Sequence, residues 1–198
     1  MPETAELFDK VAKRYDALNT LFSLGIDRLW RKRLVEQIAP SRQSLDIATG
    51  TAEVAIETTR KFNDCSVTGL DPSVGMLSLA KRKTGALGES LPISLVQGAA
   101  EHLPFRDNTF DSVTIAFGIR NTVDPLKSLR EMRRVIRPEG KIAILEFAIP
   151  KNRIISPLYL FYFNNVLPLV GSIFNTGKEY KYLSDSTSSF PQRESFVE

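Results

Sequence analysis

Between residues 44 and 149, short apolar segments alternate with segments that favour helices. The apolar segments are rich in valine, isoleucine and leucine, which favour buried strands. Helix signals lie between them: Ser73 is placed to cap one helix, and Asp124 followed by Pro125 is a typical start of another. This alternation predicts an α/β fold with a doubly wound, mostly parallel sheet.

Five strands are expected, one at the start of 44–56 and the others at 66–70, 91–98, 110–117 and 141–149. The helices expected between them span 52–61, 73–83 and 125–137. A turn is expected at residues 137–140, which read RPEG, because proline and glycine are typical turn residues. The segment after this turn is apolar enough for a strand that is buried on both faces.

The first predicted strand ends in a turn made of small residues. Residues 44–56 read SLDIATGTAEVAI, with Asp46 inside the strand and Gly50 four positions later. A strand that turns into a helix at small residues brings backbone N–H groups and a helix N-terminus against a ligand. The second strand leads to Asp71, whose carboxylate suits the two hydroxyl groups of a ribose. These features favour a nucleoside-binding site; the alternative is an ordinary strand-to-helix turn without a ligand.

A dinucleotide site is the first competing interpretation. Its fingerprint needs three glycines in the order G-x-G-x-x-G, and only Gly50 is present in this window. The acid inside the first strand, the small residues at 50 and 52, and the acid that ends the second strand resemble instead the S-adenosylmethionine (SAM) site of class I methyltransferases.

The composition limits the classes of protein that fit. A chain of 198 residues with 42% hydrophobic residues is long enough for one domain with a substantial core. The net charge of +3 is too small to argue for nucleic-acid binding, although it suits weak attraction to an anionic membrane surface. One cysteine, Cys65, and one histidine, His102, leave no internal disulfide and no metal site of zinc-ligand spacing. We therefore expect an intracellular protein without structural zinc. The N-terminus has charges where a signal peptide needs an apolar segment, so no secretion signal is expected.

Amphipathic helices are expected before the first strand. Residues 4–17 place apolar side chains at helical spacing, and a second helix is expected at 27–38, ended by Pro40. Its expected apolar side carries Leu29, Trp30, Leu34 and Ile38, and its expected basic side carries Arg28, Arg31, Lys32 and Arg33. Such a helix packs on its own domain more often than it lies on a membrane.

Residues 154–175 form the most apolar stretch, which Pro157, Pro168 and the pair Asn164-Asn165 interrupt. Two short helices over the mouth of the sheet are therefore expected rather than a spanning helix, either as a lid on the core or as an apolar wall for a lipophilic substrate. The expected organisation is a single domain with a helical cap at 1–40, a SAM-binding core at 41–150, an apolar lid at 151–183, and a linker with the start of a helix at 184–198.

With these segments in place, the sequence resembles the ubiquinone/menaquinone C-methyltransferase family (UbiE/MenG-like) over nearly all of its length. The resembling blocks, in the order of the family, are FDKVAKRYDALNTLFSLGIDRLW, LDIATGTAEVA, GLDPSVGML, AEHLPFRDNTFD, FGIRN, REMRRVIRPEGKIAILEF and VLPLVGSIF. FGIRN and the N-terminal block are the specific ones, since many methyltransferases share the nucleotide-site blocks and the RPEG turn.

The resemblance implies a class I SAM methyltransferase with a Rossmann-like fold and SAM as its cofactor. The implied reaction is methyl transfer to a ring carbon of a polyprenylated quinol, either demethylmenaquinol or the benzoquinol precursor of ubiquinone. Because that substrate carries an isoprenoid tail, we expect a cytoplasmic protein that is peripheral at the inner face of the membrane. No nucleic acid and no metal are implied.

The resemblance also implies site residues. The implied catalytic residues are Tyr15, Asn19, Arg120 and Asn121, with the last two facing the reacting ring and the first two closing over it. The implied cofactor-binding residues are Asp46, Thr49, Gly50, Asp71, Met76, Ala99, Ala100, Glu101 and Phe117. In this scheme Asp46 and Gly50 lie at the methionine end of SAM, Asp71 at the ribose and Met76 at the adenine face. His102 belongs to the loop at the adenine edge and is not assigned as a base.

The sequence departs from the family pattern in several places. After Gly50 the family has threonine, glycine and aspartate, whereas this chain reads TAE, with Ala52 and Glu53. A positive φ at Ala52 would cost about 1 kcal/mol, and its methyl group would then crowd SAM. Ala99 stands where the family places an acid or amide to meet the adenine amino group, and Asp27 replaces a commoner histidine.

The family fold continues past residue 198 with a helix and an antiparallel strand pair, and this chain lacks both. The fifth strand would then be an uncovered edge of the sheet. A shortened chain, a homodimer that covers the edge, and a protein that is no longer catalytic are the explanations left open. Beside quinol methylation, two other functions stay open: a methyltransferase-fold binding or scaffold protein with an impaired SAM site, and a methyltransferase of another small molecule.

Overall fold

The computed structural model describes residues 23, 25–38, 41–87 and 91–148, together with residues 153, 157, 161 and 165. The chain divides into two compact units, Met1–Leu145 and Glu146–Glu198, and all the elements below belong to the first. The helix expected at 4–17 lies outside the described residues, as do the helices expected at 154–175 apart from single positions. The expected division into cap, core, lid and linker stays a prediction.

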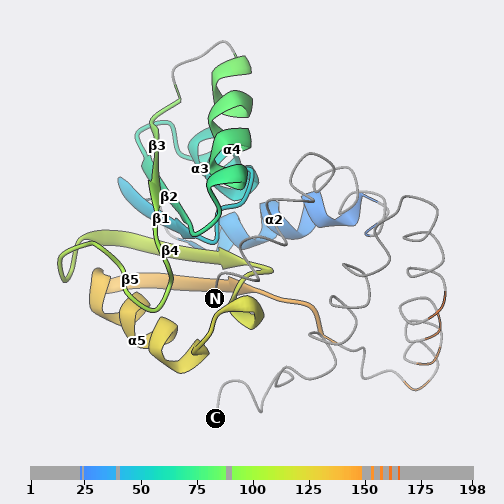
Figure 1. The fold of residues 1–198 in the computed structure, drawn as a ribbon. Coiled ribbons are helices and arrows are strands. Elements are labelled where there is room, and N and C mark those ends of the chain that lie inside the picture. The colour runs from blue at the N-terminus through green and yellow to red at the C-terminus, as the bar shows by residue number, and fades with distance from the viewer. Residues whose placement is uncertain are drawn as a thin grey trace. The chain divides into compact units, whose positions relative to one another are not determined.

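The first unit contains a five-stranded sheet in the order β3-β2-β1-β4-β5, in which every pairing is parallel (Figure 1). The strands are β1 (Gln43–Ile47), β2 (Ser66–Asp71), β3 (Ile93–Gln97), β4 (Phe110–Ala116) and β5 (Ile136–Leu145). The chain moves outward from β1 in one direction as far as β3, then crosses to β4 on the other side of β1. The predicted α/β fold with a doubly wound parallel sheet is therefore confirmed.

The helices are α2 (Ile26–Gln37), α3 (Glu53–Lys61), α4 (Val74–Ala86) and α5 (Pro125–Val135), with a short 3-10 helix, η1 (Ile119–Asn121), after β4. Two predicted helix starts are confirmed: the Ser73 side chain accepts a hydrogen bond from Met76 N, and the Asp124 side chain accepts one from Lys127 N. Right-handed crossovers in opposite directions place α5 on the other face of the sheet from α3 and α4, as Figure 1 shows.

The predictions for β5 are partly wrong. The strand includes residues 137–140, although its register with β4 jumps there: Phe110 pairs with Ile136, and Ser112 pairs with Lys141. The predicted turn is thus an excursion within the strand, since four residues of β5 lie opposite the single residue Asp111. β5 ends at Leu145 rather than at 149, and as the last strand of the described sheet it is mostly half-buried or exposed, not buried on both faces.

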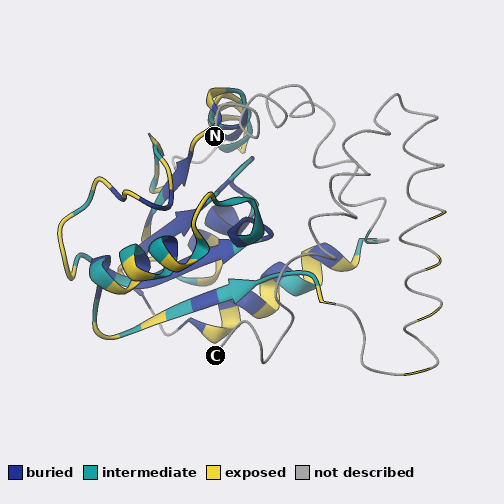
Figure 2. Ribbon diagram, turned by 60° about the horizontal axis from the view of Figure 1, so that its bottom comes forward, coloured by how far each residue is buried: buried dark blue, intermediate teal, exposed yellow. Residues whose placement is uncertain are grey.

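The predicted faces of α2 also need correction. Leu34, Val35 and Ile38 are buried against Val54 of α3 and Ala143 of β5, which fixes the helix on the sheet. The buried face further includes Asp27 and Arg31, whereas Leu29 is 48% exposed; Figure 2 shows the opposite buried and exposed faces of the helix. Sequence spacing placed Arg31 on the basic face, and its ion pair with Asp27 one turn earlier explains why it can be buried.

Candidate active site

A pocket opens at the carboxyl ends of the strands, next to the point where the strand order reverses at β1 and β4. Ligands of doubly wound sheets bind at this place. The pocket is lined by Ile47, Ala48, Gly50, Leu70, Asp71, Pro72, Met76, Ala99, Ala100, Glu101, Ala116, Phe117, Gly118, Asn121, Thr122 and Val123. Most of this wall is apolar, which suits a flat ring, and a few polar groups interrupt it.

The loop between β1 and α3 adopts the left-handed backbone conformation at every second residue. The φ angles are +52° at Ala48, +55° at Gly50 and +67° at Ala52. A side chain at Gly50 would meet no atom within 4 Å, so the backbone there faces open space in the pocket. A Cβ at Gly118 would lie 2.6 Å from the Cβ of Ala48, so glycine at 118 lets the loops after β1 and β4 approach each other.

Asp71, at the end of β2, joins the two loops that frame one side of the pocket. Its Oδ2 accepts a hydrogen bond from Gly50 N at 2.9 Å, and its Oδ1 accepts one from Ser73 N at 2.9 Å. A carboxylate oxygen can accept more than one hydrogen bond, and the ribose role of Asp71 stays a prediction. Met76, one turn into α4, lines the same pocket.

Asp46 lies beneath the pocket rather than in its wall. It is buried, and it accepts hydrogen bonds from the hydroxyls of Thr49 at 2.6 Å and Thr114 at 2.8 Å. Burial raises the pKa of Asp46 to about 6, and it outweighs the opposing effects of the two hydroxyls and of the Arg31 charge. Asp46 and Thr49 are therefore placed to support the β1 loop from below.

The loop after β3 supplies the opposite wall. Ala99, Ala100 and Glu101 line the pocket, and Glu101 Oε1 accepts hydrogen bonds from Val123 N at 2.6 Å and Asp124 N at 3.4 Å. These bonds tie the loop after β3 to the start of α5.

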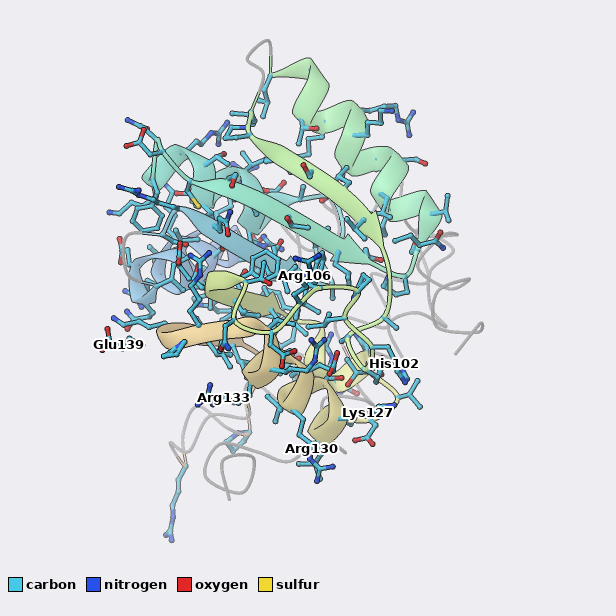
Figure 3. The ribbon with its side chains drawn as sticks, turned by 90° about the vertical axis from the view of Figure 1, so that its left-hand side faces the viewer. His102, Arg106, Lys127, Arg130, Arg133 and Glu139 are labelled. Carbon is cyan, nitrogen blue, oxygen red and sulfur yellow. The ribbon has the colours of Figure 1, made fainter. Side chains whose placement is uncertain are left out.

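His102, the next residue of this loop, does not line the pocket. Its Nε2 lies 2.5 Å from Lys127 Nζ, so the side chain is directed toward α5 (Figure 3). That His102 is not a catalytic base stays a prediction.

Phe117 follows β4 with a φ of +56°, and it lines the pocket. Its N–H donates to Leu145 O at 2.7 Å, and its carbonyl oxygen accepts hydrogen bonds from Arg120 Nη1 at 3.0 Å and Asn121 Nδ2 at 3.2 Å. Asn121 lines the pocket, and Arg120 belongs to the same 3-10 turn without being part of the lining.

The structure brings most of the predicted site residues together. In the pocket wall are Gly50, Asp71, Met76, Ala99, Ala100, Glu101, Phe117 and Asn121. Asp46, Thr49 and Arg120 lie next to this wall but not in it, and Tyr15 and Asn19 lie outside the described residues. The individual roles assigned to all these residues stay predictions.

Several lining residues were missed by reasoning from the sequence: Ile47, Ala48, Leu70, Pro72, Ala116, Gly118, Thr122 and Val123. Most of them lie at or just after the ends of β1, β2 and β4. The predicted strand ends could have identified them, because the residues that follow parallel strands gather at one edge of a sheet.

The positive φ considered for Ala52 is present, but its methyl group does not line the pocket. Ala52 belongs instead to a hydrophobic cluster with Ala55, Ile56, Val67 and other buried side chains. The pocket lining therefore does not support the prediction that this methyl group crowds the cofactor.

Solved structures share this fold. A SAM-dependent methyltransferase of Thermotoga maritima superimposes with a TM-score of 0.61 at 19% sequence identity, over 82% of this chain and 70% of that one. A SAM-dependent methyltransferase of Aquifex aeolicus gives a TM-score of 0.59 at 21% identity, over 70% of this chain and 75% of that one. The strand order and the pocket at the switch point define the fold class as that of the class I SAM-dependent methyltransferases.

Residues 2–198 match the model of the ubiE/COQ5 methyltransferase family, and the chain belongs to this family. A relative from Geotalea daltonii, named ubiquinone/menaquinone biosynthesis C-methyltransferase UbiE, is 46% identical over 96% of this chain and 83% of its own length. Relatives with the same name are 44% identical in Geobacter sulfurreducens, over 96% of this chain and 76% of theirs, and 40% identical in Rickettsia prowazekii, over 96% and 79%.

The protein is accordingly a SAM-dependent methyltransferase, and the described pocket fits this cofactor. The backbone of Gly50 faces open space in the pocket, and the Asp71 carboxylate ends β2 beside it. Leu70 and Met76 add apolar residues to the same pocket wall.

Proposed function

We propose that the protein transfers a methyl group from SAM to a ring carbon of a polyprenylated quinol, either a demethylmenaquinol or the methoxy-polyprenyl-benzoquinol that precedes ubiquinone. The observation that carries the proposal is 40–46% identity, along almost the whole chain, with proteins named ubiquinone/menaquinone biosynthesis C-methyltransferase. The pocket supports it, because the FGIRN segment places Phe117 and Asn121 in the wall next to the proposed cofactor site.

Positioning accounts for much of the expected rate. SAM supplies an electrophilic methyl group, and transfer to a carbon nucleophile is an in-line displacement that depends on alignment of the two reactants. Asp71 would hold the ribose hydroxyls, Met76 the adenine face, and the loop at Gly50 the methionine end.

The substrate ring has to be made nucleophilic. A quinol carbon becomes a better nucleophile when its hydroxyl loses a proton, or shares it with a base, in the transition state. Arg120 would stabilise the developing phenolate charge with its planar, permanently charged guanidinium. Asn121 would orient the quinol oxygen from the pocket wall, and Tyr15 and Asn19 would close over the ring.

We place the enzyme peripherally at the cytoplasmic face of the membrane, where the polyprenyl tail of its substrate lies. No helix among the described residues is long and apolar enough to cross a membrane. The outer face of α5 supports contact with an anionic surface: Leu126 is 66% exposed, and Arg130 and Arg133 are exposed on the same helix (Figure 3). Exposed apolar and basic side chains on one helix suit the interface of an anionic bilayer.

Vesicle sedimentation tests this placement. The double variant Arg130→Glu, Arg133→Glu should lose binding to vesicles that contain phosphatidylglycerol. The matched variant Arg60→Glu, Lys61→Glu, with the same charge change at the exposed end of α3, should bind as the wild type does. Equal loss in both variants would show that net charge, and not the α5 face, decides the binding.

Transfer of a labelled methyl group tests the function itself. The purified chain, labelled SAM and a short-tailed demethylmenaquinol or benzoquinol should give a ring-methylated product. Arg120→Met should reduce turnover about 100-fold or more, as removal of an electrostatic stabiliser does, whereas Arg60→Met should have no effect. A wild-type chain that binds SAM but methylates neither quinol would refute the proposal and favour a methyltransferase of another small molecule.

A further inference from the structure

Two side chains of α2 cover the ring of Phe117. The Trp30 ring centroid lies 6.3 Å from that of Phe117 with the planes inclined by 57°. The guanidinium carbon of Arg31 lies 5.7 Å from the Phe117 centroid, which is within the range of cation–π contacts. One face of the pocket wall is therefore held by a helix that does not itself line the pocket.

Arg31 is fixed in turn by Asp27, one helical turn earlier. Asp27 accepts hydrogen bonds from Arg31 Nη1 through one carboxylate oxygen and from Ser23 Oγ at 2.6 Å through the other. The side chain of Arg31 is only 10% exposed, and that of Asp27 only 5%. Burial alone would raise the pKa of Asp27, but the hydrogen bonds from Ser23 and Arg31 and the Arg31 charge outweigh it and lower the pKa. The ion pair is thus charged and held in one place.

Phe117 needs such support, because it is a non-glycine residue with a φ of +56°. A left-handed backbone at a bulky residue persists only where the surrounding contacts impose it. The hydrogen bond to Leu145 O fixes the N–H of Phe117, and the α2 side chains fix its ring. With the N–H and the ring of Phe117 held in this way, its carbonyl oxygen accepts hydrogen bonds from the side chains of both Arg120 and Asn121.

We propose that Arg31, clamped by Asp27, is a positioning residue that acts through Phe117 on the two side chains of η1. It keeps the ring in the pocket wall and keeps the Phe117 carbonyl where it orients Arg120 and Asn121. This role of Arg31 rests on the proposed function wherever methyl transfer is the quantity measured. A lysine at position 31 would keep the charge and the pair with Asp27, but it would lack the flat guanidinium that stacks on a ring.

A double-mutant cycle tests the inference. Arg31→Lys should lower kcat about 5-fold or more, with the melting temperature within a few degrees of the wild type. In a Phe117→Leu background, the same substitution should have almost no further effect, because the ring through which it acts is gone. Lys32→Met, which changes the exposed neighbouring cation on the same helix, is the control and should leave kcat unchanged.

A merely structural role for Arg31 would lower kcat by the same factor in both backgrounds, and that result would overturn the inference. Wild-type turnover of quinol separately tests the proposed function. If the wild type binds SAM without methylating a quinol, the cycle is read from SAM affinity, since Phe117 lines the proposed cofactor pocket. Additive effects on affinity would then overturn the inference, and a coupling of about 3-fold or more would support it.

Discussion

At the scale of single residues, the loop after β1 shows how a local backbone requirement can be met without glycine. Ala52 has a φ of +67° and no exposed surface, so its methyl group is buried in the cluster under α3. The left-handed backbone costs an alanine about 1 kcal/mol, and burial of one methyl group returns a similar amount. The substitution in this chain is therefore close to neutral for the fold.

Ala52→Gly should change the free energy of unfolding by less than about 1 kcal/mol, because relief of the backbone strain offsets the lost methyl group. Ala55→Gly is the matched change, in the same cluster and equally buried but inside α3, and it should cost about 2 kcal/mol. Urea denaturation measures both. Equal losses would contradict the role given to the positive φ.

Asp46 predicts a pH dependence of stability. The folded protein keeps the Asp46 proton up to a pKa of about 6, whereas the ordinary value is 3.8. This group therefore favours the folded state most at pH values below 3.8, and its contribution is lost as the pH rises through about 6. The whole effect is about 3 kcal/mol.

The test is a comparison with Asp46→Asn, which keeps the shape but cannot ionise. Between pH 4 and pH 7, the difference in unfolding free energy between variant and wild type should shift in favour of the variant as the pH rises. The comparison cancels other carboxylates such as Asp111 and Glu131, whose pKa values are lowered. A difference that does not change with pH would show that Asp46 ionises normally in the folded state.

At the scale of elements, β1, β4 and β5 are joined at their N-terminal ends by one side chain. Asp111 Oδ2 accepts hydrogen bonds from the backbone N–H groups of Arg42 and Gln43, both at 2.9 Å, and its Oδ1 accepts one from Arg137. The residues of β5 that leave the regular register lie opposite this same position. Asp111 thus fastens the irregular part of the sheet.

Asp111→Ala should lower the free energy of unfolding by about 2 to 3 kcal/mol, because two backbone donors and one arginine lose a charged acceptor. Asp107→Ala removes a carboxylate that is 68% exposed and pairs with Arg134, and it should cost less than about 0.5 kcal/mol. Thermal or chemical denaturation of the two variants compares them directly. Similar losses would mean that the Asp111 contacts contribute no more than a surface ion pair.

The elements themselves were largely predictable from the sequence. Alternating apolar segments and clear caps at Ser73 and Asp124 identified the strands and helices of the sheet. The course of β5 was not predictable, because RPEG is typical of a turn and nothing local shows that the chain resumes the same strand. The burial of Arg31 was missed for a related reason: helical spacing shows which residues share a face, but not that Asp27 makes a cation acceptable inside.

At the scale of the whole molecule, the candidate site was predicted chiefly by resemblance. The residues alone favoured a nucleoside site at Gly50 and Asp71, and the hydrogen bond between these two confirms that the loop and the strand end meet. The wall residues after β4 became visible only with the strand order, since β1 and β4 are far apart in sequence and adjacent in the sheet. The support of Phe117 by α2 depends on tertiary contacts that no pattern in the sequence encodes.

Calorimetric titration with SAM, on the wild type beside Asp71→Ala and Asp107→Ala, tests the central claim most directly. If the pocket at the switch point is the SAM site, the wild type and Asp107→Ala should bind with micromolar affinity. Asp71→Ala should bind at least about 10-fold more weakly, because the ribose loses a charged acceptor. Absence of binding to the wild type, or equal binding by Asp71→Ala, would contradict the account of this site.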